Sequence, residues 1–203
     1  MLAVAVDEPF DDPDYLFEPW WPGVRAIAFS ERGELRLQVD GLADATAAFP
    51  EVAELPQRLA EDGVVLDGTL LVLDEDGRPD AGLLRARLDG RGLPGRPAYV
   101  ASDLLWAGGE PVVRRSFRVR RRWLEAILDP GDRVTVGRGY VRDGTLVAEA
   151  LATLGIDGLS ARHLRARYRA GTAGSAWLRA PLTPAEPRPR PTLALILRLP
   201  LGD

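Results

Sequence analysis

The sequence predicts an α+β fold in which helices pack outside antiparallel sheets. Side chains at 25–29 and 34–39 alternate between apolar and polar, as in half-buried strands. Longer apolar runs at 64–73 and 99–106 favour further strands. Three other segments have the spacing of short helices: 81–88, 113–128 and 143–154. With 203 residues, 46% of them hydrophobic, the chain is long enough for one full-sized domain or for two lobes that share a cleft.

The strands nearest the N-terminus are expected to form a hairpin. Residues Arg25–Phe29 and Glu34–Val39 supply its two arms, and Ser30–Gly33 is expected as a four-residue turn. Pro50 favours a helix start, and the apolar residues after it predict an amphipathic helix of up to about three turns. Pro56 is expected to kink that helix.

Two turn signals divide the central region. Asp67-Gly68 stands between two apolar runs and Asp76-Gly77 follows them, so we expect strands separated by turns. A short helix is expected at Ala81–Leu88, followed by a loop rich in Gly and Pro from Gly90 to Pro97. Tyr99–Trp106 is the next expected strand.

The arginine-rich segment Val113–Leu128 predicts a helix. Helical spacing places Phe117, Arg120, Leu124 and Ile127 on one side of it and most of the other arginines on the opposite side. That opposite side has two interpretations, a solvated face or a phosphate-binding surface.

The C-terminal third alternates short elements with loops. We expect a strand at Val134–Val136 and a helix at Asp143–Leu154 that ends at Gly155. Residues 182–203 are expected as a proline-rich spacer followed by a last strand at Leu193–Leu199.

Charge is distributed unevenly along the chain. The formal net charge is −4, which argues against a general nucleic-acid binder. Residues 1–14, expected as an acidic lead-in made of a short strand and a loop, hold five of the 30 acids and no arginine. Residues 15–203 therefore hold 25 acids and 26 arginines, and this part of the chain is close to neutral.

Composition also excludes several kinds of chemistry. The sequence has no cysteine, so it predicts neither disulfides nor a thiolate metal site. No signal-peptide pattern and no membrane span is recognised, which makes a cytoplasmic location the default expectation. All 26 basic residues are arginine and none is lysine, so a lysyl-nucleotide or Schiff-base mechanism is excluded throughout these residues.

A series of motifs, taken together and in order, resembles the adenylation (nucleotidyltransferase) domain of ATP-dependent DNA ligases. The resemblance covers about residues 15–181 and implies a two-lobed fold of antiparallel sheets with outer helices. A ligase would continue into an oligonucleotide-binding barrel domain, which we do not expect in these residues. The matching stretches are Glu18-Pro19-Trp20-Trp21-Pro22-Gly23-Val24-Arg25, Asp44–Glu51, Leu66-Asp67-Gly68-Thr69-Leu70-Leu71, Tyr99–Trp106, Val113–Leu128, Gly155–Gly171 and Trp177–Pro181.

The resemblance also implies where chemistry belongs, and several of those positions have changed. The lysine that attacks the nucleotide α-phosphate is replaced by Trp20, whose indole nitrogen has no usable lone pair. Thr69 replaces a glutamate near the sugar and metal, Ser102 replaces the aromatic that stacks on the base, and Asp157 replaces a metal-associated glutamate. We therefore expect no catalytic residue and no protein metal site.

Other positions keep groups that could still bind a nucleotide. Glu18 is a candidate to read an adenine amino group, or is kept for turn geometry. Arg25, Arg162 and Arg179 are candidates to hold a phosphate, or are charges retained in a cleft. His163, the only histidine, is a conceivable substitute nucleophile or acid/base, but a structural or surface role is expected for it. The full set of nucleotide-binding candidates is Glu18, Trp20, Arg25, Asp67, Thr69, Ser102, Asp157, Arg162 and Arg179.

Two functions follow from this pattern. The first is a ligase-family domain without ligation activity, which binds nucleotide, nicked DNA or a DNA-repair protein. The second is a residual enzyme that binds ATP non-covalently or uses another nucleophile. ATP and Mg²⁺ are the only cofactors that the resemblance suggests, and neither is required by the residues present. A third interpretation is a folded domain that has kept the structure of the family but binds no ligand.

Overall fold

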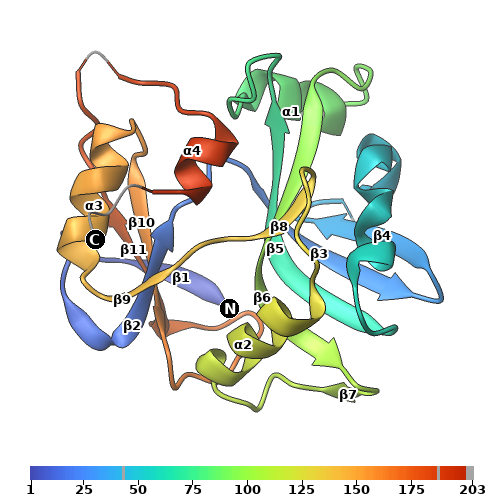
Figure 1. The fold of residues 1–203 in the computed structure, drawn as a ribbon, viewed down its shortest axis with the longest axis horizontal. Helices are drawn as coiled ribbons and strands as arrows, with labels where there is room; N and C mark the ends of the chain where they lie inside the picture. Colours follow the sequence, from blue (N-terminus) through green and yellow to red (C-terminus); the bar gives the residue numbers. More distant parts are fainter. Residues whose placement is uncertain (43, 187, 200–203) are drawn as a thin grey trace. The chain divides into compact units, whose positions relative to one another are not determined.

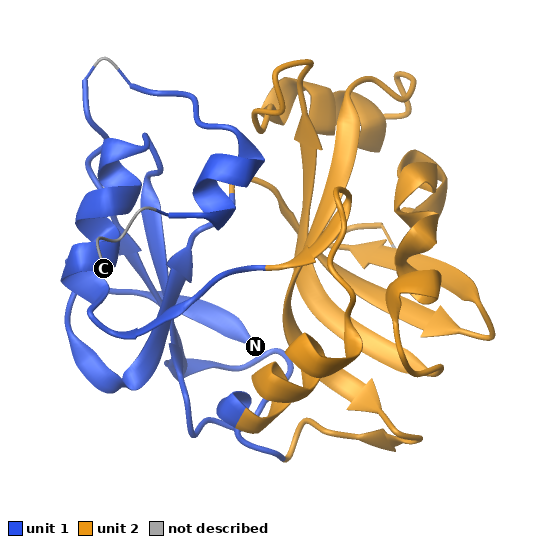
Figure 2. Ribbon diagram, in the orientation of Figure 1, with its two compact units in different colours: residues 1–21, 115–118, 137–203 blue, residues 22–114, 119–136 orange. Residues whose placement is uncertain are grey.

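The computed structural model describes residues 1–42, 44–186 and 188–199. Parts of the expected C-terminal spacer and last strand, residues 187 and 200–203, lie outside the described residues. The chain forms two compact units, shown in Figure 2: unit 1 comprises residues 1–21, 115–118 and 137–203, and unit 2 comprises residues 22–114 and 119–136.

Unit 1 is built on one five-stranded sheet (Figure 1). Its strand order is β1-β11-β10-β2-β9, with β1 parallel to β11 and the other neighbours antiparallel. The helices that go with it are α3 and α4. The bounds are β1 Leu2–Ala5, β2 Asp12–Pro19, β9 Tyr140–Arg142, α3 Gly144–Thr153, β10 Gly158–His163, β11 Ala173–Pro181 and α4 Leu193–Leu197.

Unit 2 is built on a six-stranded sheet. Its order is β4-β3-β5-β6-β7, with β8 added in parallel to β6. Helix α2 begins in residues counted with unit 1 and continues in unit 2. The bounds are β3 Val24–Glu31, β4 Glu34–Val39, η1 Thr46–Ala48, η2 Pro50–Arg58, β5 Val64–Leu73, α1 Ala81–Leu88, β6 Arg96–Ala107, β7 Glu110–Pro111, α2 Phe117–Ile127 and β8 Val134–Val136.

One face of the unit 1 sheet is covered by α3. Phe17 on β2 and Leu159 on β10 are fully buried there, together with Val147 and Leu151 of the helix. Because side chains alternate along a strand, the neighbours of these residues point to the opposite face of the sheet. That opposite face carries the polar and aromatic residues described below.

The acidic lead-in is part of this unit. Strand β1 pairs with β11, and the Asp11 carboxylate accepts hydrogen bonds from the backbone N–H, at 2.8 Å, and the hydroxyl of Thr145. Thr145 lies in the first turn of α3, where free N–H groups favour a negative charge. The backbone hydrogen bond from Thr145 holds the pKa of Asp11 below its usual range.

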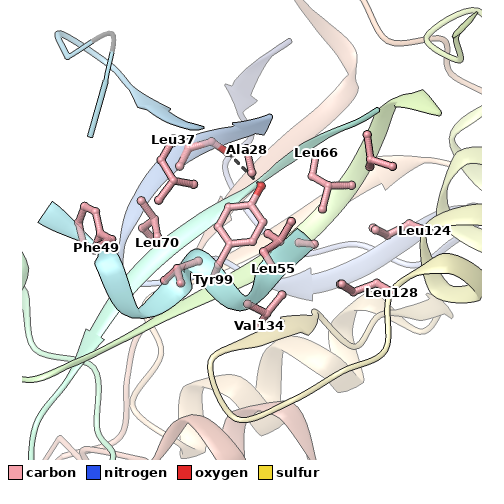
Figure 3. Close-up of a cluster of buried hydrophobic side chains, with 14 of the residues drawn as sticks. Ala28, Leu37, Phe49, Leu55, Leu66, Leu70, Tyr99, Leu124, Leu128 and Val134 are labelled. Atoms are coloured by element: carbon pink, nitrogen blue, oxygen red, sulfur yellow. Dashed lines mark hydrogen bonds between the residues drawn. The ribbon is translucent and has the colours of Figure 1, made fainter. Parts of the chain in front are cut away.

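The core of unit 2 lies between its sheet and the helices η2 and α2. Figure 3 shows Phe49 and Leu55 packed with the strand residues Leu66 and Leu70 around Tyr99. The Tyr99 hydroxyl donates to the carbonyl of Ala26 at 3.3 Å, which satisfies the one polar group of this buried ring.

The structure confirms the hairpin and corrects its turn. Strands β3 and β4 pair from Ala26↔Val39 to Glu31↔Glu34, so the turn is the two residues Arg32 and Gly33 rather than four. Their φ angles are +54° and +78°. Positive values at both positions match the twist of the adjoining strands, which is why such two-residue turns are favoured in hairpins.

The turn expected at Asp67-Gly68 is wrong. Both residues lie within the continuous strand β5 and pair with β3 and with β6. The glycine serves a different purpose, because a Cβ on Gly68 would lie 2.5 Å from the carbonyl oxygen of Val100 and 2.6 Å from the ring of Tyr99. Gly68 is needed for close approach between strands rather than for a reversal of the chain.

Two further elements differ from expectation. The apolar run expected as a last strand forms helix α4, where Leu193 and Ile196 are buried and the Thr192 hydroxyl accepts from the N–H of Leu195. The helix beginning at Pro50 is a 3₁₀ helix, η2, that contains Pro56. The expected helices at α1, α2 and α3 and the strand at β8 are confirmed. Among the described residues, no helix is long and apolar enough to cross a membrane.

Candidate functional site

Four of the predicted site residues share one face of the unit 1 sheet. Glu18 lies opposite Ser160 on β10, and Ser160 lies opposite Arg179 on β11. Arg162 is two residues beyond Ser160, and Trp20 follows the end of β2. Since residues two apart on a strand point the same way, these side chains gather on the face that α3 does not cover.

An aromatic-arginine stack occupies this face. We use this name for Arg179, Trp20, Trp177 and Arg162. The Cζ of Arg179 lies 4.6 Å from the ring centre of Trp20, and the Trp20 and Trp177 rings are stacked with centres 5.6 Å apart. The Cζ of Arg162 lies 4.2 Å from the ring centre of Trp177. Two indoles are thus held between two guanidinium groups, an arrangement favoured by the negative charge on the ring faces.

Backbone and side-chain hydrogen bonds fix both indoles. The Trp177 Nε1 donates to the hydroxyl of Ser160 at 2.9 Å, and the backbone N–H of Trp20 donates to the carbonyl of Gly158 at 2.8 Å. Gly158 leaves the space that Trp20 needs, because a Cβ at Gly158 would lie 2.8 Å from the Trp20 Cβ. The sequence identifies Trp20 as a site residue but not the contacts that Ser160 and Gly158 make with the two indoles. Only the Gly-x-x-Gly spacing of Gly155 and Gly158 could have indicated them.

Arg162 of the stack and the neighbouring Glu18 are both buried. Glu18 is 2% exposed and Arg162 is 4% exposed, with 3.8 Å between the Arg162 Nε and a carboxylate oxygen of Glu18. The Arg162 Cζ also lies 5.6 Å from the ring centre of Phe117. Burial of either charge alone would be costly, so proximity to the other stabilises both.

The other polar site residues, Asp157 excepted, lie in unit 2. Arg25 donates from Nε and Nη2 to the two carboxylate oxygens of Asp67, at 2.8 and 2.6 Å. Thr69 lies opposite Arg25 in the β3-β5 register. The Ser102 hydroxyl donates to the backbone carbonyl of Asp67 at 3.2 Å. Arg25 is therefore already engaged by a 1% exposed carboxylate, which neutralises its charge.

Asp157 belongs to neither group. It precedes β10, is half-exposed, and accepts a hydrogen bond from Nη2 of Arg188 at 3.0 Å. The Nε of Arg188 donates to the carbonyl of Gly155 at 2.9 Å. Arg188 comes from the proline-rich segment, which sequence reasoning treated as a spacer, so this pairing was missed.

The single histidine packs on unit 1 without a catalytic arrangement among the described residues. The ring of His163 meets Tyr15 edge-on at 5.0 Å, and its Nδ1 accepts from the backbone N–H of Arg165 at 3.1 Å. The structural role expected for His163 fits this environment.

Two arginines of α2 are structural rather than available for binding. Arg120 and Asp103 are both fully buried, and Arg120 donates to both carboxylate oxygens at 2.7 and 2.8 Å. Arg121 is also buried and donates to the carbonyl of Ser102 and to Glu125. Most of the other arginines in this segment are exposed, as expected: Arg114, Arg115, Arg118 and Arg122. Arg121 is the exception, because its contact with β6 is tertiary and does not follow from helical periodicity.

The residues present do not fit the nucleotide and metal chemistry that the motifs imply. An attacking group needs a lone pair, which the Trp20 indole lacks. Thr69 is neutral where a carboxylate would approach a hard cation, and Asp157 is paired with Arg188. Within the described parts of the chain, no three His, Cys, Asp or Glu side chains cluster as a metal site would require.

The fold is that of ligase adenylation domains, which form a class of covalent nucleotidyltransferases. It superposes on the structure of a mycobacterial DNA ligase D complexed with ATP and MES with a TM-score of 0.75 and 27% identity, over 89% of this chain and 58% of that chain. The chain belongs to the ATP dependent DNA ligase domain family, whose sequence profile matches residues 1–180.

Curated relatives agree with this assignment. The multifunctional non-homologous end joining protein LigD of Mycolicibacterium smegmatis is 30% identical over 165 residues, which is 81% of this chain and 21% of LigD. A probable DNA ligase of Anaeromyxobacter dehalogenans strain 2CP-1 is 36% identical over 166 residues, or 77% of this chain and 32% of that protein. The chain thus spans about a fifth to a third of the length of these relatives.

Proposed function

We propose that this chain is a ligase-family domain that forms no covalent nucleotide intermediate and serves DNA repair by binding rather than by ligation. The observation that carries the proposal is the aromatic-arginine stack. Trp20 stands at the sequence position of the attacking lysine, and its ring is stacked with Trp177 and lies under the guanidinium group of Arg179. An indole in that place cannot form a phosphoramidate with a nucleotide.

Composition supports the same conclusion. None of the 203 residues is lysine, so no neighbouring lysine could take over the attack. The relatives provide the biological setting, since one is named as a non-homologous end joining protein and another as a probable DNA ligase. A domain with this fold and without the nucleophile retains a role in the same setting as a binding module.

The test is intact-mass analysis after incubation with ATP and Mg²⁺. We expect no mass increase by one AMP group on the native chain. The matched variant Trp20→Lys restores the amine, and Trp20→Lys/Thr69→Glu restores the carboxylate as well; a known DNA ligase, incubated in parallel, confirms that the assay detects an adduct. An AMP adduct on the native chain would overturn the proposal, whatever the variants do.

Non-covalent binding of ATP is a second candidate, because Glu18, Arg162 and Arg179 remain together on one face of unit 1. Calorimetric titration with ATP and Mg²⁺ separates the two. Affinity tighter than about 100 µM, roughly 5 kcal/mol, would indicate a nucleotide-binding face, and Arg179→Gln should then weaken it. No heat up to about 1 mM ATP would leave nucleic acid or a protein as the ligand.

A further inference from the structure

The proline-rich segment is hydrogen-bonded to the end of α3 and to the loop before β10. We call residues 182–186 and 188–199 the strap; it leads from the end of β11 to helix α4 (Figure 1). Near its start, the backbone N–H groups of Leu182 and Ala185 donate to the carbonyls of Asp157 and Ala152, both at 3.0 Å. The first part of the strap is therefore held by the backbone of unit 1.

Arg188 makes the central contact of the strap. Its Nε donates to the carbonyl of Gly155 at 2.9 Å, and its Nη2 donates to the Asp157 carboxylate at 3.0 Å. The next residue lies directly on Gly155, where a Cβ would come within 2.3 Å of the carbonyl oxygen of Pro189. A glycine at 155 is therefore required for the strap to lie this close.

Helix α4 anchors the far end of the strap. Its residues Leu193 and Ile196 are buried, as is Leu199 just beyond it, and the Tyr140 hydroxyl donates to the carbonyl of Leu199 at 3.2 Å. The prolines between β11 and α4 restrict the backbone even when the strap is open. Closing the strap therefore loses less conformational entropy than closing an ordinary loop would, and a few anchors are enough.

The loop that Arg188 holds is also in contact with the aromatic-arginine stack. Gly158 follows Asp157 directly, and its carbonyl accepts from the backbone N–H of Trp20 at 2.8 Å. Gly158 also pairs with Pro181 at the end of β11, the strand that supplies two members of the stack. Residues 155–158 are thus fixed by Arg188 and by Trp20 together.

We propose that Arg188 is a positioning residue that closes the strap on unit 1 and, through residues 155–158, holds the aromatic-arginine stack in place. By resemblance, Asp157 stands where the family has a metal-associated glutamate, and in this chain its carboxylate anchors a guanidinium instead. The two side chains are 53% and 51% exposed, so dissolved salt screens their attraction. The strap is therefore a closure whose strength depends on ionic strength.

This closure goes beyond the proposed function and does not depend on what the stack binds. An AMP adduct on the native chain would overturn the proposed function and leave the strap unaffected. A strap that does not depend on Arg188 would remove the closure and leave the absence of adenylation standing.

The first test is hydrogen exchange at the Leu182 and Ala185 amides, followed by NMR, which measures local opening of the strap. In Arg188→Gln both amides should exchange about 5-fold faster, because a hydrogen bond to a carboxylate and one to a carbonyl are lost. The amides of Leu159 and Ala161 in β10 should keep their native rates. In the native chain the strap amides should exchange faster as salt rises from roughly 50 to 500 mM, whereas in Arg188→Gln they should not respond to salt.

The second test reports on the stack itself. The Trp20 and Trp177 rings lie 5.6 Å apart and are tilted by 28°, so their electronic transitions couple and contribute to the circular dichroism of the chain. We expect this contribution to lose intensity in Arg188→Gln. If the strap amides exchange faster and the indole signal stays unchanged, the link from Arg188 to the stack is overturned.

The matched control is Arg198→Gln, which removes the same charge from an exposed arginine of the strap. It should keep both strap amides within about twofold of their native rates. Asp157→Asn should accelerate them as Arg188→Gln does, and the double variant should show less than the sum of the two effects, because both changes break one interaction. Additive effects, equal acceleration in Arg198→Gln or in the β10 amides, or native rates that ignore salt would overturn the proposal.

Discussion

Replacing Trp20 with alanine removes one of the two indole rings of the aromatic-arginine stack. The lost contact with Trp177 is worth about 0.5–1.5 kcal/mol, and the lost contact with the exposed Arg179 about 0.5–1 kcal/mol. Full truncation of a buried aromatic costs about 3–5 kcal/mol, and Trp20 is only half-buried. We therefore expect Trp20→Ala to lower the free energy of unfolding by about 2–3 kcal/mol.

Urea unfolding followed by far-UV circular dichroism measures this loss without relying on tryptophan fluorescence. Trp20→Phe keeps a ring between Trp177 and Arg179 and should lose only about 1 kcal/mol. Gly158→Ala tests the same contact from the other strand, because the added Cβ would lie 2.8 Å from the Trp20 Cβ. Since neither backbone can move freely, it should cost about 1–3 kcal/mol.

A small effect would refute this reasoning. If Trp20→Ala changes the free energy of unfolding by less than about 0.5 kcal/mol, the indole makes no stabilising contacts. The ring would then be free to leave the position of the missing lysine, and the stack would not hold Trp20 there. Trp20→Phe, measured in parallel, shows whether ring packing or overall bulk matters.

Two predictions concern buried arginines. Asp103→Asn leaves the fully buried Arg120 without its counter-charge and should cost about 3–5 kcal/mol in urea unfolding, whereas a loss below about 1 kcal/mol would contradict the pairing. Hydrogen bonds from Arg87 hold the pKa of Glu51 below its usual range. The charged Glu51 therefore stabilises the fold above its unfolded-state pKa. This stabilisation is lost as the pH falls through the lower folded-state pKa. Glu51→Gln should cost about 2 kcal/mol at pH 7, and that difference should shrink in urea titrations below about pH 4; a pH-independent difference would contradict this.

Local sequence patterns were sufficient to predict those elements whose conformation does not depend on distant contacts. The hairpin of β3 and β4 and the helices α1 and α3 follow from periodicity and from turn and cap residues. The apolar run at Leu193–Leu197 was ambiguous, because a short run fits a strand or a buried helix turn equally well. Only the burial of Leu193 and Ile196 on the same side shows that it is helical.

The sequence named candidate residues for the site but not the contacts that they make. The resemblance put Trp20, Arg162 and Arg179 in separate motifs, and the strand register brings them to one face of the unit 1 sheet. The partners that fix them come from tertiary packing, which one sequence does not reveal. The ion pair between Asp157 and Arg188 is an example, since the composition of a proline-rich segment does not predict an ion pair.

The interleaving of the two units has a consequence for synthesis of the chain. Strand β2 emerges from the ribosome early, yet its sheet neighbours β9 and β10 follow only after the whole of unit 2 has been made. Unit 2 can complete its core first, since its own strands are available in one nearly continuous stretch. Until β9 and β10 are made, both edges of β2 are unpaired. A chaperone that shields residues 12–19 would protect the nascent chain from pairing with strands of other chains.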